Sequence, residues 1–165
     1  MKKVKWGILG AGGIADRRTL PGMMDCKFAE VTAVMEVDPD NAERLREKYG
    51  AKYAYTSAEE LIANPEVEAV YIASPINFHK SQVFAAAKAG KHIFCEKPVA
   101  TTLTGLDKLE KVYYEAKTRY ADRNLCFVGM FGIDYLPHFE TAYRFIREGG
   151  IGDVRLANAQ KSYRM

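Results

Sequence analysis

The chain has 165 residues, of which 48% are hydrophobic, and this length and composition suit one domain, or one domain and the start of another. Its 24 basic and 21 acidic residues leave a net charge of +3, which is too small to predict binding to nucleic acid or to an anionic membrane, and no apolar stretch is long enough to span a bilayer. The three cysteines stand far apart without a Cys-x-x-Cys pair, which indicates a reducing, cytoplasmic setting and predicts no metal site.

The first predicted unit is a strand, a glycine-rich turn and a helix. The apolar run over 4–9 predicts the strand, and the turn follows at 10–15 with the sequence Gly-Ala-Gly-Gly-Ile-Ala. Its Gly-x-Gly-x-x-Ala spacing is typical of dinucleotide binding, because Gly10 makes the tight turn and Gly12 lets the backbone approach a pyrophosphate, which the helix N-terminus then attracts. The alternative is a tight turn without a ligand. The residues expected to bind the cofactor here are Gly10, Gly12, Gly13 and Ile14.

An acidic residue follows the next predicted strand. The β-branched run at 30–35 predicts that strand, and Glu36 stands directly after it, where the fingerprint expects a carboxylate for the ribose hydroxyls. The alternative is a solvated carboxylate at a strand exit. Because a carboxylate would repel a 2′-phosphate and no arginine immediately follows Glu36, the sequence favours NAD over NADP as the cofactor.

The remaining chain alternates predicted helices and strands. Helices are expected over 39–49, between an Asp38 cap and a Gly50 stop, from a Ser57–Glu60 capping box to Ala63, around 83–90, over 106–119 and over 137–148. Strands are expected at 69–73, 92–95 and 125–128, with a further strand at 154–163. This alternation predicts an α/β fold, a doubly wound parallel sheet of about six strands, which is the Rossmann fold.

An ordered set of short motifs follows the glycine-rich turn. Ser74-Pro75 and His79 come after the strand at 69–73, Ala-Gly-Lys stands at 89–91, and Glu96-Lys97-Pro98 follows the strand at 92–95. Gly-Gly-Ile-Gly-Asp-Val at 149–154 closes the set. Each motif is common alone, but in this order they resemble the glucose-fructose oxidoreductase / inositol dehydrogenase (Gfo/Idh/MocA) family over nearly the whole chain.

The resemblance implies that the segment Glu96-Lys97-Pro98 borders the nicotinamide of the cofactor. An ammonium at the carboxyl end of a central strand would also lie in the crevice where doubly wound sheets bind ligands. Lys97 is therefore the predicted catalytic residue, which hydrogen-bonds a substrate hydroxyl or an oxyanion that develops during hydride transfer. The alternative is a surface lysine in a loop. Glu96 accepts a hydrogen bond from the nicotinamide ribose or positions Lys97.

The resemblance also implies that the loop with Ser74, Pro75 and Asn77 packs beside the cofactor. Asn77 stands one place later than the asparagine that often follows the proline in the family, so it is either a cofactor contact or the N-cap of the next helix. His79 is expected to be a structural residue in the first turn of that helix rather than a proton shuttle, because the sequence offers it no evident partner.

Two departures from the family pattern concern the end of the chain. Residues 131–135 contain no arginine, although the family often places one beside its active site there. Family members also continue into a second α/β domain, which carries much of the substrate pocket and an Asp-x-x-x-His pair, whereas this chain stops at Met165. We therefore expect residues 1–130 to form the dinucleotide-binding domain and residues 131–165 to form a connecting helix and the first strand of an incomplete second domain.

The resemblance implies the cofactor-binding domain of an oxidoreductase that transfers a hydride between NAD and a sugar, cyclitol or related hydroxy compound. The full-length form is expected to be a homo-oligomer. A chain without the second domain is expected to bind the cofactor without turning over a substrate. The alternative is a non-catalytic NAD-sensing regulator or scaffold, because the family includes transcriptional regulators that keep the NAD fold.

Overall fold

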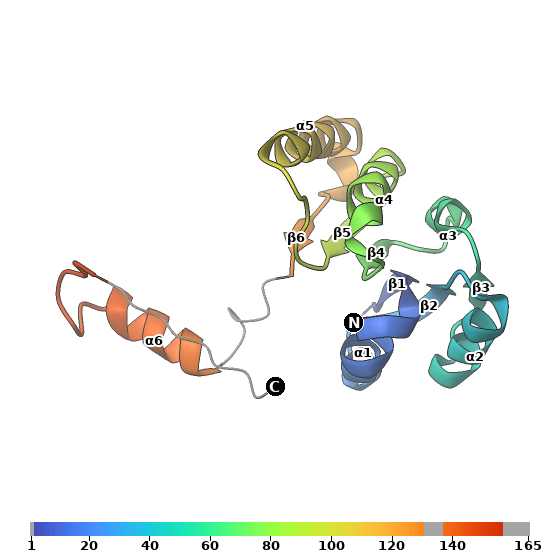
Figure 1. Cartoon of the computed structure of the whole chain (residues 1–165), viewed down its shortest axis with the longest axis horizontal. Coiled ribbons are helices and arrows are strands. Elements are labelled where there is room, and N and C mark those ends of the chain that lie inside the picture. The colour runs from blue at the N-terminus through green and yellow to red at the C-terminus, as the bar shows by residue number, and fades with distance from the viewer. Residues whose placement is uncertain (1, 131–136, 157–165) are drawn as a thin grey trace. The chain divides into compact units, whose positions relative to one another are not determined.

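The computed structural model of the chain describes residues 2–130 and 137–156. The chain divides into two compact units, Met1–Met130 and Phe131–Met165. In the first unit, six parallel strands form one sheet with helices on both of its faces (Figure 1). The predicted doubly wound Rossmann fold is therefore confirmed.

The sheet has the strand order β3-β2-β1-β4-β5-β6. The chain builds outward from β1 to β2 and β3 on one side and then returns to build β4, β5 and β6 on the other. The order in which strands are added therefore reverses between the neighbours β1 and β4. Such a switch point opens a crevice at the carboxyl ends of the strands. The strands are β1 Val4–Leu9, β2 Ala29–Met35, β3 Tyr53–Tyr55, β4 Ala69–Ile72, β5 His92–Cys95 and β6 Phe127–Gly129.

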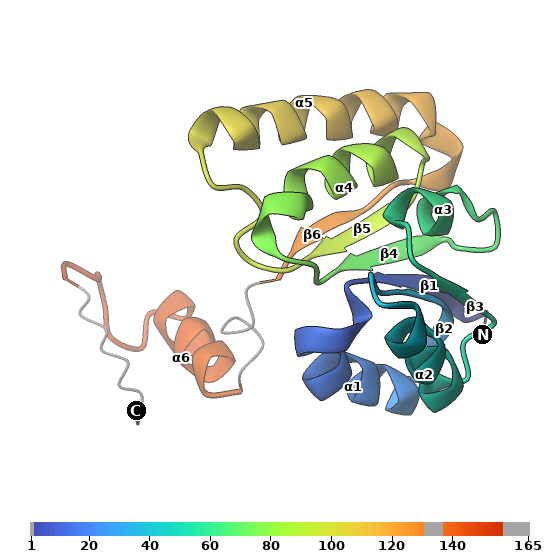
Figure 2. The ribbon, with the colours of Figure 1, turned by 45° about the vertical axis from the view of Figure 1, so that its right-hand side comes forward.

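The helices of the first unit cover both faces of the sheet, and Figure 2 shows α4 and α5 over one face and α1 and α2 over the other. The first helical segment is a π-helix, η1, that continues into α1 and has a non-helical residue at Gly13 (ψ −109°). The helical elements are η1 Ala11–Thr19, α1 Leu20–Asp25, α2 Pro39–Tyr49, α3 Ala58–Ala63, α4 Ile76–Lys88, α5 Leu103–Arg119, the short 3-10 turn η2 Ala121–Arg123 and, in the second unit, α6 Pro137–Arg147.

The hydrophobic core has two layers because neighbouring residues of the central strands point to opposite faces of the sheet. Leu9 and Ile72 pack with the helices α3, α4 and α5, whereas Ile8 and Tyr71 pack with α1 and α2. All four side chains are fully buried. Burying each one stabilises the fold by about 1.5–3 kcal/mol, and together they fix the two strands that flank the switch point.

The caps that the sequence predicts for α2 and α3 are present in the structure. The Asp38 side chain accepts hydrogen bonds from the backbone of Asp40 and Asn41, and Gly50 ends α2 in the left-handed conformation (φ +63°). The Ser57 hydroxyl accepts a hydrogen bond from the Glu60 backbone at 3.4 Å, so α3 starts where the capping box predicts. These local signals correctly predicted where both helices begin and end.

The predicted strands differ from the structure at three places. β3 was not predicted from the sequence, because three residues are too few to show a period-2 pattern. The strand expected at 125–128 begins only at Phe127. Val154–Leu156 form no strand, so the expectation of a strand from 154 is wrong there, and residues 157–163 lie outside the described part of the chain.

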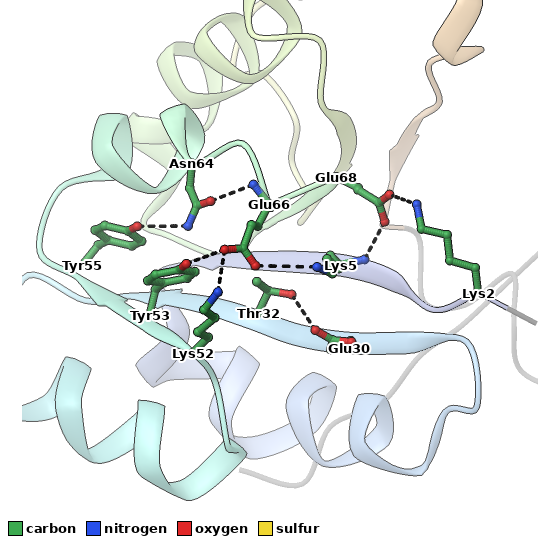
Figure 3. Close-up of polar contacts among 10 residues, drawn as sticks. All are labelled: Lys2, Lys5, Glu30, Thr32, Lys52, Tyr53, Tyr55, Asn64, Glu66 and Glu68. Carbon is green, nitrogen blue, oxygen red and sulfur yellow. Dashed lines mark hydrogen bonds and ion pairs between the residues drawn. The ribbon is translucent and has the colours of Figure 1, made fainter.

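A polar network closes the amino ends of β1, β3 and β4 (Figure 3). The Glu66 carboxylate accepts hydrogen bonds from Lys52 Nζ at 2.6 Å and from Tyr53 Oη at 2.5 Å, with Lys5 Nζ at 3.6 Å. Glu68 accepts from the Lys5 backbone at 3.1 Å. The hydrogen bonds from Lys52 and Tyr53 hold the pKa of Glu66 at about 2, well below its usual value. This network ties the loop before β4 to the edge of the sheet.

Candidate functional site

The carboxyl ends of the central strands surround a cavity of about 770 Å³. This volume lies within the range of small-molecule sites, and the cavity stands at the switch point, where doubly wound sheets bind ligands. Its walls come from the turn after β1, the end of β2, the loop between β3 and α3, and the loop between β4 and α4. Among the lining residues are Gly10, Gly13, Glu36, Thr56, Ser74, Pro75, Phe78 and Gln82.

Gly10 makes the closest backbone approach in this crevice. It has φ +73°, and a Cβ atom built on it would lie 2.6 Å from both the backbone nitrogen and the Cα of Ser74. Real side chains do not tolerate that distance, and only glycine adopts this conformation without strain. Gly10 therefore brings the turn after β1 against the end of β4.

Gly12 and Glu36 meet at the floor of the turn. The Gly12 backbone N–H donates to Glu36 Oε1 at 2.6 Å, and a Cβ on Gly12 would lie 2.8 Å from that oxygen and 3.1 Å from Asn41 Nδ2. A side chain at Gly12 would fill the space between the turn and the Glu36 carboxylate. Gly13 and Ile14 are exposed beside it. This turn and Glu36 form a small cradle, in which the Gly12 N–H is bound to the Glu36 carboxylate.

Arg44 lies beside this cradle but is already bound. Its guanidinium donates to Asn41 Oδ1 at 2.8 and 2.9 Å and to Asp16 Oδ2 at 3.3 Å. Burial acts to raise the pKa of Asp16, but hydrogen bonds from Lys48, Tyr49 and Arg44 outweigh it and hold the pKa below its usual value. Asp16 therefore carries a negative charge at neutral pH and retains Arg44 as its partner.

Ser74 and Pro75 lie in the loop after β4, and Asn77 lies in the first turn of α4. Ser74 Oγ donates to Gln82 Oε1 at 2.5 Å, which fixes the cavity wall between the loop and α4. Pro75 is the N-cap of α4, and Asn77 is exposed in the first turn. The N-cap interpretation of Asn77 is therefore wrong, because α4 begins at Ile76, two residues earlier than that role requires.

His79 is a buried residue in the first turn of α4, as expected for a structural role. Its Nε2 lies 2.8 Å from the Ser74 carbonyl oxygen and its Nδ1 lies 3.0 Å from the Pro98 carbonyl oxygen. Carbonyl oxygens only accept hydrogen bonds, so a neutral imidazole donates to one of them and an imidazolium donates to both. The sequence indicated neither partner, since Pro98 is 19 residues away.

The segment Glu96-Lys97-Pro98 forms the turn after β5, and the peptide bond between Lys97 and Pro98 is cis. Glu96 Oε1 accepts a hydrogen bond from Tyr71 Oη at 2.7 Å, and Glu96 Oε2 accepts from the Lys97 backbone at 3.3 Å. Lys97 itself is exposed. Burial, with a smaller contribution from Glu96, raises the pKa of Tyr71, so its hydroxyl keeps the proton that it donates.

Only some of the site residues predicted from the sequence line the cavity. Five of the expected residues do not line it, although one of them, Gly12, is hydrogen-bonded to Glu36 within the turn. Thr56, Phe78 and Gln82 line it but were not identified from the sequence, because β3 and the true start of α4 were not recognised. The expected residues that do not line the cavity are Gly12, Ile14, Asn77, Glu96 and Lys97.

A second cavity of about 700 Å³ lies at the amino ends of the strands. Lys91 lines it but is buried, and its Nζ donates to the carbonyl oxygens of Asn64 at 2.8 Å and Val67 at 2.7 Å. Burial and the charge of Arg123 lower the pKa of Lys91. Two backbone acceptors therefore hold this amine in place, and it supports the loop before β4.

Within residues 2–130, 137 and 139–156, no three His, Cys, Asp or Glu side chains lie close enough together to hold a metal ion. Over the same ranges, no helix is both long and apolar enough to cross a membrane. The segment 131–135, where the sequence lacks the family's arginine, lies outside the described residues.

Comparisons with known proteins agree on the family. Residues 4–121 match the oxidoreductase family with an NAD-binding Rossmann fold, Gfo/Idh/MocA. The chain is 32% identical over 155 residues to an uncharacterized oxidoreductase of Rhizobium meliloti, covering 94% of this chain and 44% of that protein. It is also 32% identical over 161 residues to inositol 2-dehydrogenase of Acidothermus cellulolyticus, covering 95% of this chain and 44% of that protein.

A solved structure gives the same match. The crystal structure of a 3-ketoreductase from Actinomadura kijaniata, in complex with NADP and TDP-benzene, superposes with a TM-score of 0.79 at 29% sequence identity. The match covers 93% of this chain and 45% of that chain. The chain thus spans less than half the length of these relatives.

Proposed function

The chain belongs to the Gfo/Idh/MocA oxidoreductase family through its NAD-binding Rossmann fold, and on this premise we propose that it supplies the cofactor-binding part of a dehydrogenase for a sugar, cyclitol or related hydroxy compound. The observation that carries the proposal is the cradle of Gly10, Gly12 and Glu36 at the switch point of the sheet. NAD, when bound, supplies the hydride acceptor through its nicotinamide ring. The protein's own residues bind the cofactor, orient it and accept or donate protons.

In this proposal, Gly10, Gly12, Gly13 and Ile14 hold the pyrophosphate, and Glu36 accepts hydrogen bonds from the adenosine ribose. Glu36 also favours NAD over NADP, because its carboxylate repels a 2′-phosphate. The hydrogen bonds of Arg44 to Asp16 and Asn41 support this preference, since they occupy the guanidinium that would otherwise attract that phosphate.

Ser74, Pro75 and Asn77 would flank the cofactor farther along the crevice, and Lys97 would act as the catalytic residue. Its exposed amine stands at the carboxyl end of β5, where it can hydrogen-bond the hydroxyl that loses its proton as the substrate is oxidised. Both carboxylate oxygens of Glu96 have protein partners. This favours Glu96 as the residue that positions Lys97 over Glu96 as an acceptor from the nicotinamide ribose.

For the whole protein, we propose that residues 1–130 are the dinucleotide-binding domain and that residues 131–165 contain the connecting helix and the start of a substrate domain. In α6, the large side chains of Tyr143, Phe145 and Ile146 are exposed. We also propose that the whole protein acts on a sugar or polyol and forms a homo-oligomer. The free cysteines Cys26 and Cys95 support a reducing, cytoplasmic setting.

Calorimetric titration of the chain with NAD and with NADP tests the cofactor assignment. We expect NAD to bind about tenfold more tightly, because only NADP brings a phosphate to the Glu36 carboxylate. Glu36→Ala should narrow that ratio, whereas Glu59→Ala, which removes another carboxylate from the cavity wall, should leave it unchanged. Equal or tighter binding of NADP to the unaltered chain would overturn the assignment of Glu36.

A further inference from the structure

We infer that Tyr71 and His79 are positioning residues, which contact the Glu96-Lys97-Pro98 turn from the two faces of the sheet. By holding the backbone of this turn in place, they keep the Lys97 amine positioned at the crevice. The inference rests on the proposed role of Lys97. Neither residue belongs to the set that the sequence analysis assigned to the cofactor or to catalysis, and both are almost completely buried.

Tyr71 holds the first residue of the turn. It lies at 0% exposure in β4, within the core layer on the α1 side, with its ring centroid 5.4 Å from that of Phe94. A phenylalanine would fill that packing space equally well, so the hydroxyl is explained by its partners. Because Tyr71 Oη donates its only hydrogen to Glu96 Oε1 at 2.7 Å, Thr19 Oγ1 at 3.0 Å must donate to Tyr71. The Glu96 carboxylate is thereby anchored to β4 and to the end of η1.

His79 holds the last residue of the turn. It comes from α4, on the opposite core layer, and is 2% exposed. Its ring lies between the Pro98 carbonyl oxygen, 3.0 Å from Nδ1, and the Ser74 carbonyl oxygen, 2.8 Å from Nε2, and the contact with Pro98 is a hydrogen bond when Nδ1 carries a proton. Ser74 also lines the cofactor cavity. His79 therefore connects the cavity wall to the turn that carries Lys97.

The two contacts together immobilise the backbone on both sides of Lys97. The α1 and α4 helices lie on opposite faces of the sheet (Figure 2), so the turn is held at Glu96 from one face and at Pro98 from the other. The Glu96 backbone N–H also donates to the Ile72 carbonyl oxygen at 2.9 Å. A lysine side chain is long and flexible, so the volume that its amine explores depends on how firmly its backbone is held. Loss of either contact should disorder the turn without disturbing the phosphate cradle.

Amide hydrogen exchange of the ¹⁵N-labelled chain tests the inference directly. We expect Tyr71→Phe and His79→Gln each to speed exchange of the Lys97 amide about tenfold, the effect of losing roughly one hydrogen bond, while amides of β1 and β2 keep their rates. His79→Leu, which lacks any donor, should have a larger effect than His79→Gln. Two matched controls remove similar groups elsewhere. Tyr113→Phe loses a hydroxyl bonded to the Leu125 carbonyl oxygen, and His92→Gln loses a ring bonded to the Cys126 backbone; neither should change exchange at Lys97.

The ratio of NADH affinity to ADP affinity separates a positioning role at Lys97 from a general role in stability, because a general loss of stability would not change that ratio. NADH reaches the nicotinamide end of the crevice, whereas ADP occupies only the adenosine and phosphate end. We expect Tyr71→Phe and His79→Gln each to weaken NADH about three- to tenfold and to leave ADP unchanged, with a combined effect smaller than the product of the two because both act on one turn.

The outcomes separate this inference from the proposed function. Failure of the unaltered chain to bind either NADH or ADP would refute the proposed function, and the exchange experiment would still decide whether the two residues hold the turn. Unchanged exchange at Lys97 in both variants, or parallel losses of NADH and ADP binding, would overturn the inference.

Discussion

The two ends of the sheet differ in the residues that border their cavities. At the amino ends, Lys52 and Glu66 are bound to each other (Figure 3). Lys91 is bound to the loop before β4, although a cavity of about 700 Å³ lies there. At the carboxyl ends, a cavity of about 770 Å³ is bordered by the glycine turn, in which Gly13 is exposed, and Lys97 in the turn after β5 is exposed as well. Cavity size therefore does not distinguish the ends. The difference lies in position, because the carboxyl-end cavity stands at the switch point of the sheet, beside the glycine turn.

The largest expected effect contrasts one lysine from each end. In a form of the protein that turns over a polyol or sugar, Lys97→Ala should lower kcat by about 10²–10⁴-fold, the usual contribution of a proton-transfer group, with little change in stability or cofactor affinity. Lys91→Met should instead lower the free energy of unfolding, because it leaves the carbonyl oxygens of Asn64 and Val67 without their donor. NADH absorbance and urea unfolding measure the two effects. Unchanged turnover in Lys97→Ala would refute the catalytic assignment.

A pair of glycines separates backbone strain from close approach. Gly10→Ala and Gly50→Ala both place a side chain at positive φ, which costs about 1–2 kcal/mol. Only the Cβ at position 10 would also collide with the Ser74 backbone, whereas among the described residues no atom lies within 4 Å of a Cβ at position 50. We expect urea unfolding to give about 2–4 kcal/mol of destabilisation for Gly10→Ala and about half of that for Gly50→Ala. Equal losses would mean that the turn does not need the approach to β4.

Gly12→Val tests whether the cradle binds the phosphates. The valine would displace the Glu36 carboxylate and occupy the space above the turn, so NAD affinity should fall about 100-fold while the fold is retained. Gly22→Val, in α1 and with open space around its Cβ, is the matched control for the cost of valine in a helix. Calorimetric titration and thermal unfolding of both variants measure binding and fold. Normal NAD affinity in Gly12→Val would contradict the location of the site.

The smallest expected effect concerns the amino-end network. The pKa of Glu66 is about 2, held down by hydrogen bonds from Lys52 and Tyr53. A carboxyl whose folded pKa is depressed stabilises the fold above its unfolded pKa, near 4.5, and loses that contribution as the pH falls toward 2. Lys52→Met should raise the pKa of Glu66 toward its usual value and flatten the acid side of the stability profile. Carbon-13 NMR titration of the carboxyl gives the pKa, and an unchanged value would show that the ion pair does not form in solution.

The sequence predicted the elements whose signals are local. The cap at Asp38, the stop at Gly50 and the turn at 10–15 each specify backbone geometry within a few residues. The contact of Glu36 with the Gly12 N–H was not predicted, and the role of Glu36 toward the ribose stays a prediction. The edge strand β3 escaped because it has three residues and its neighbours complete its pattern only in space.

The contacts around Lys97 could not be predicted from the sequence, for a different reason. Tyr71 and Glu96 are 25 residues apart, and His79 and Pro98 are 19 apart, so no spacing rule relates the partners. Tyr71 reads as an ordinary buried strand residue, and the functional value of its hydroxyl depends on the tertiary packing of β4 beside β5. Long-range hydrogen bonds of this kind have no sequence signature of their own.

Mapping the binding of NAD onto the ¹⁵N-labelled chain tests the central claim, that the carboxyl-end cavity and not the amino-end cavity is the ligand site. The account predicts NAD-dependent shifts of amides in the turn at 10–14, at Glu36, in the loop at 74–78 and at Lys97. It predicts no shifts at Lys5, Lys52, Glu66 or Lys91. Shifts concentrated at the amino ends, or none at either end at millimolar NAD, would contradict it.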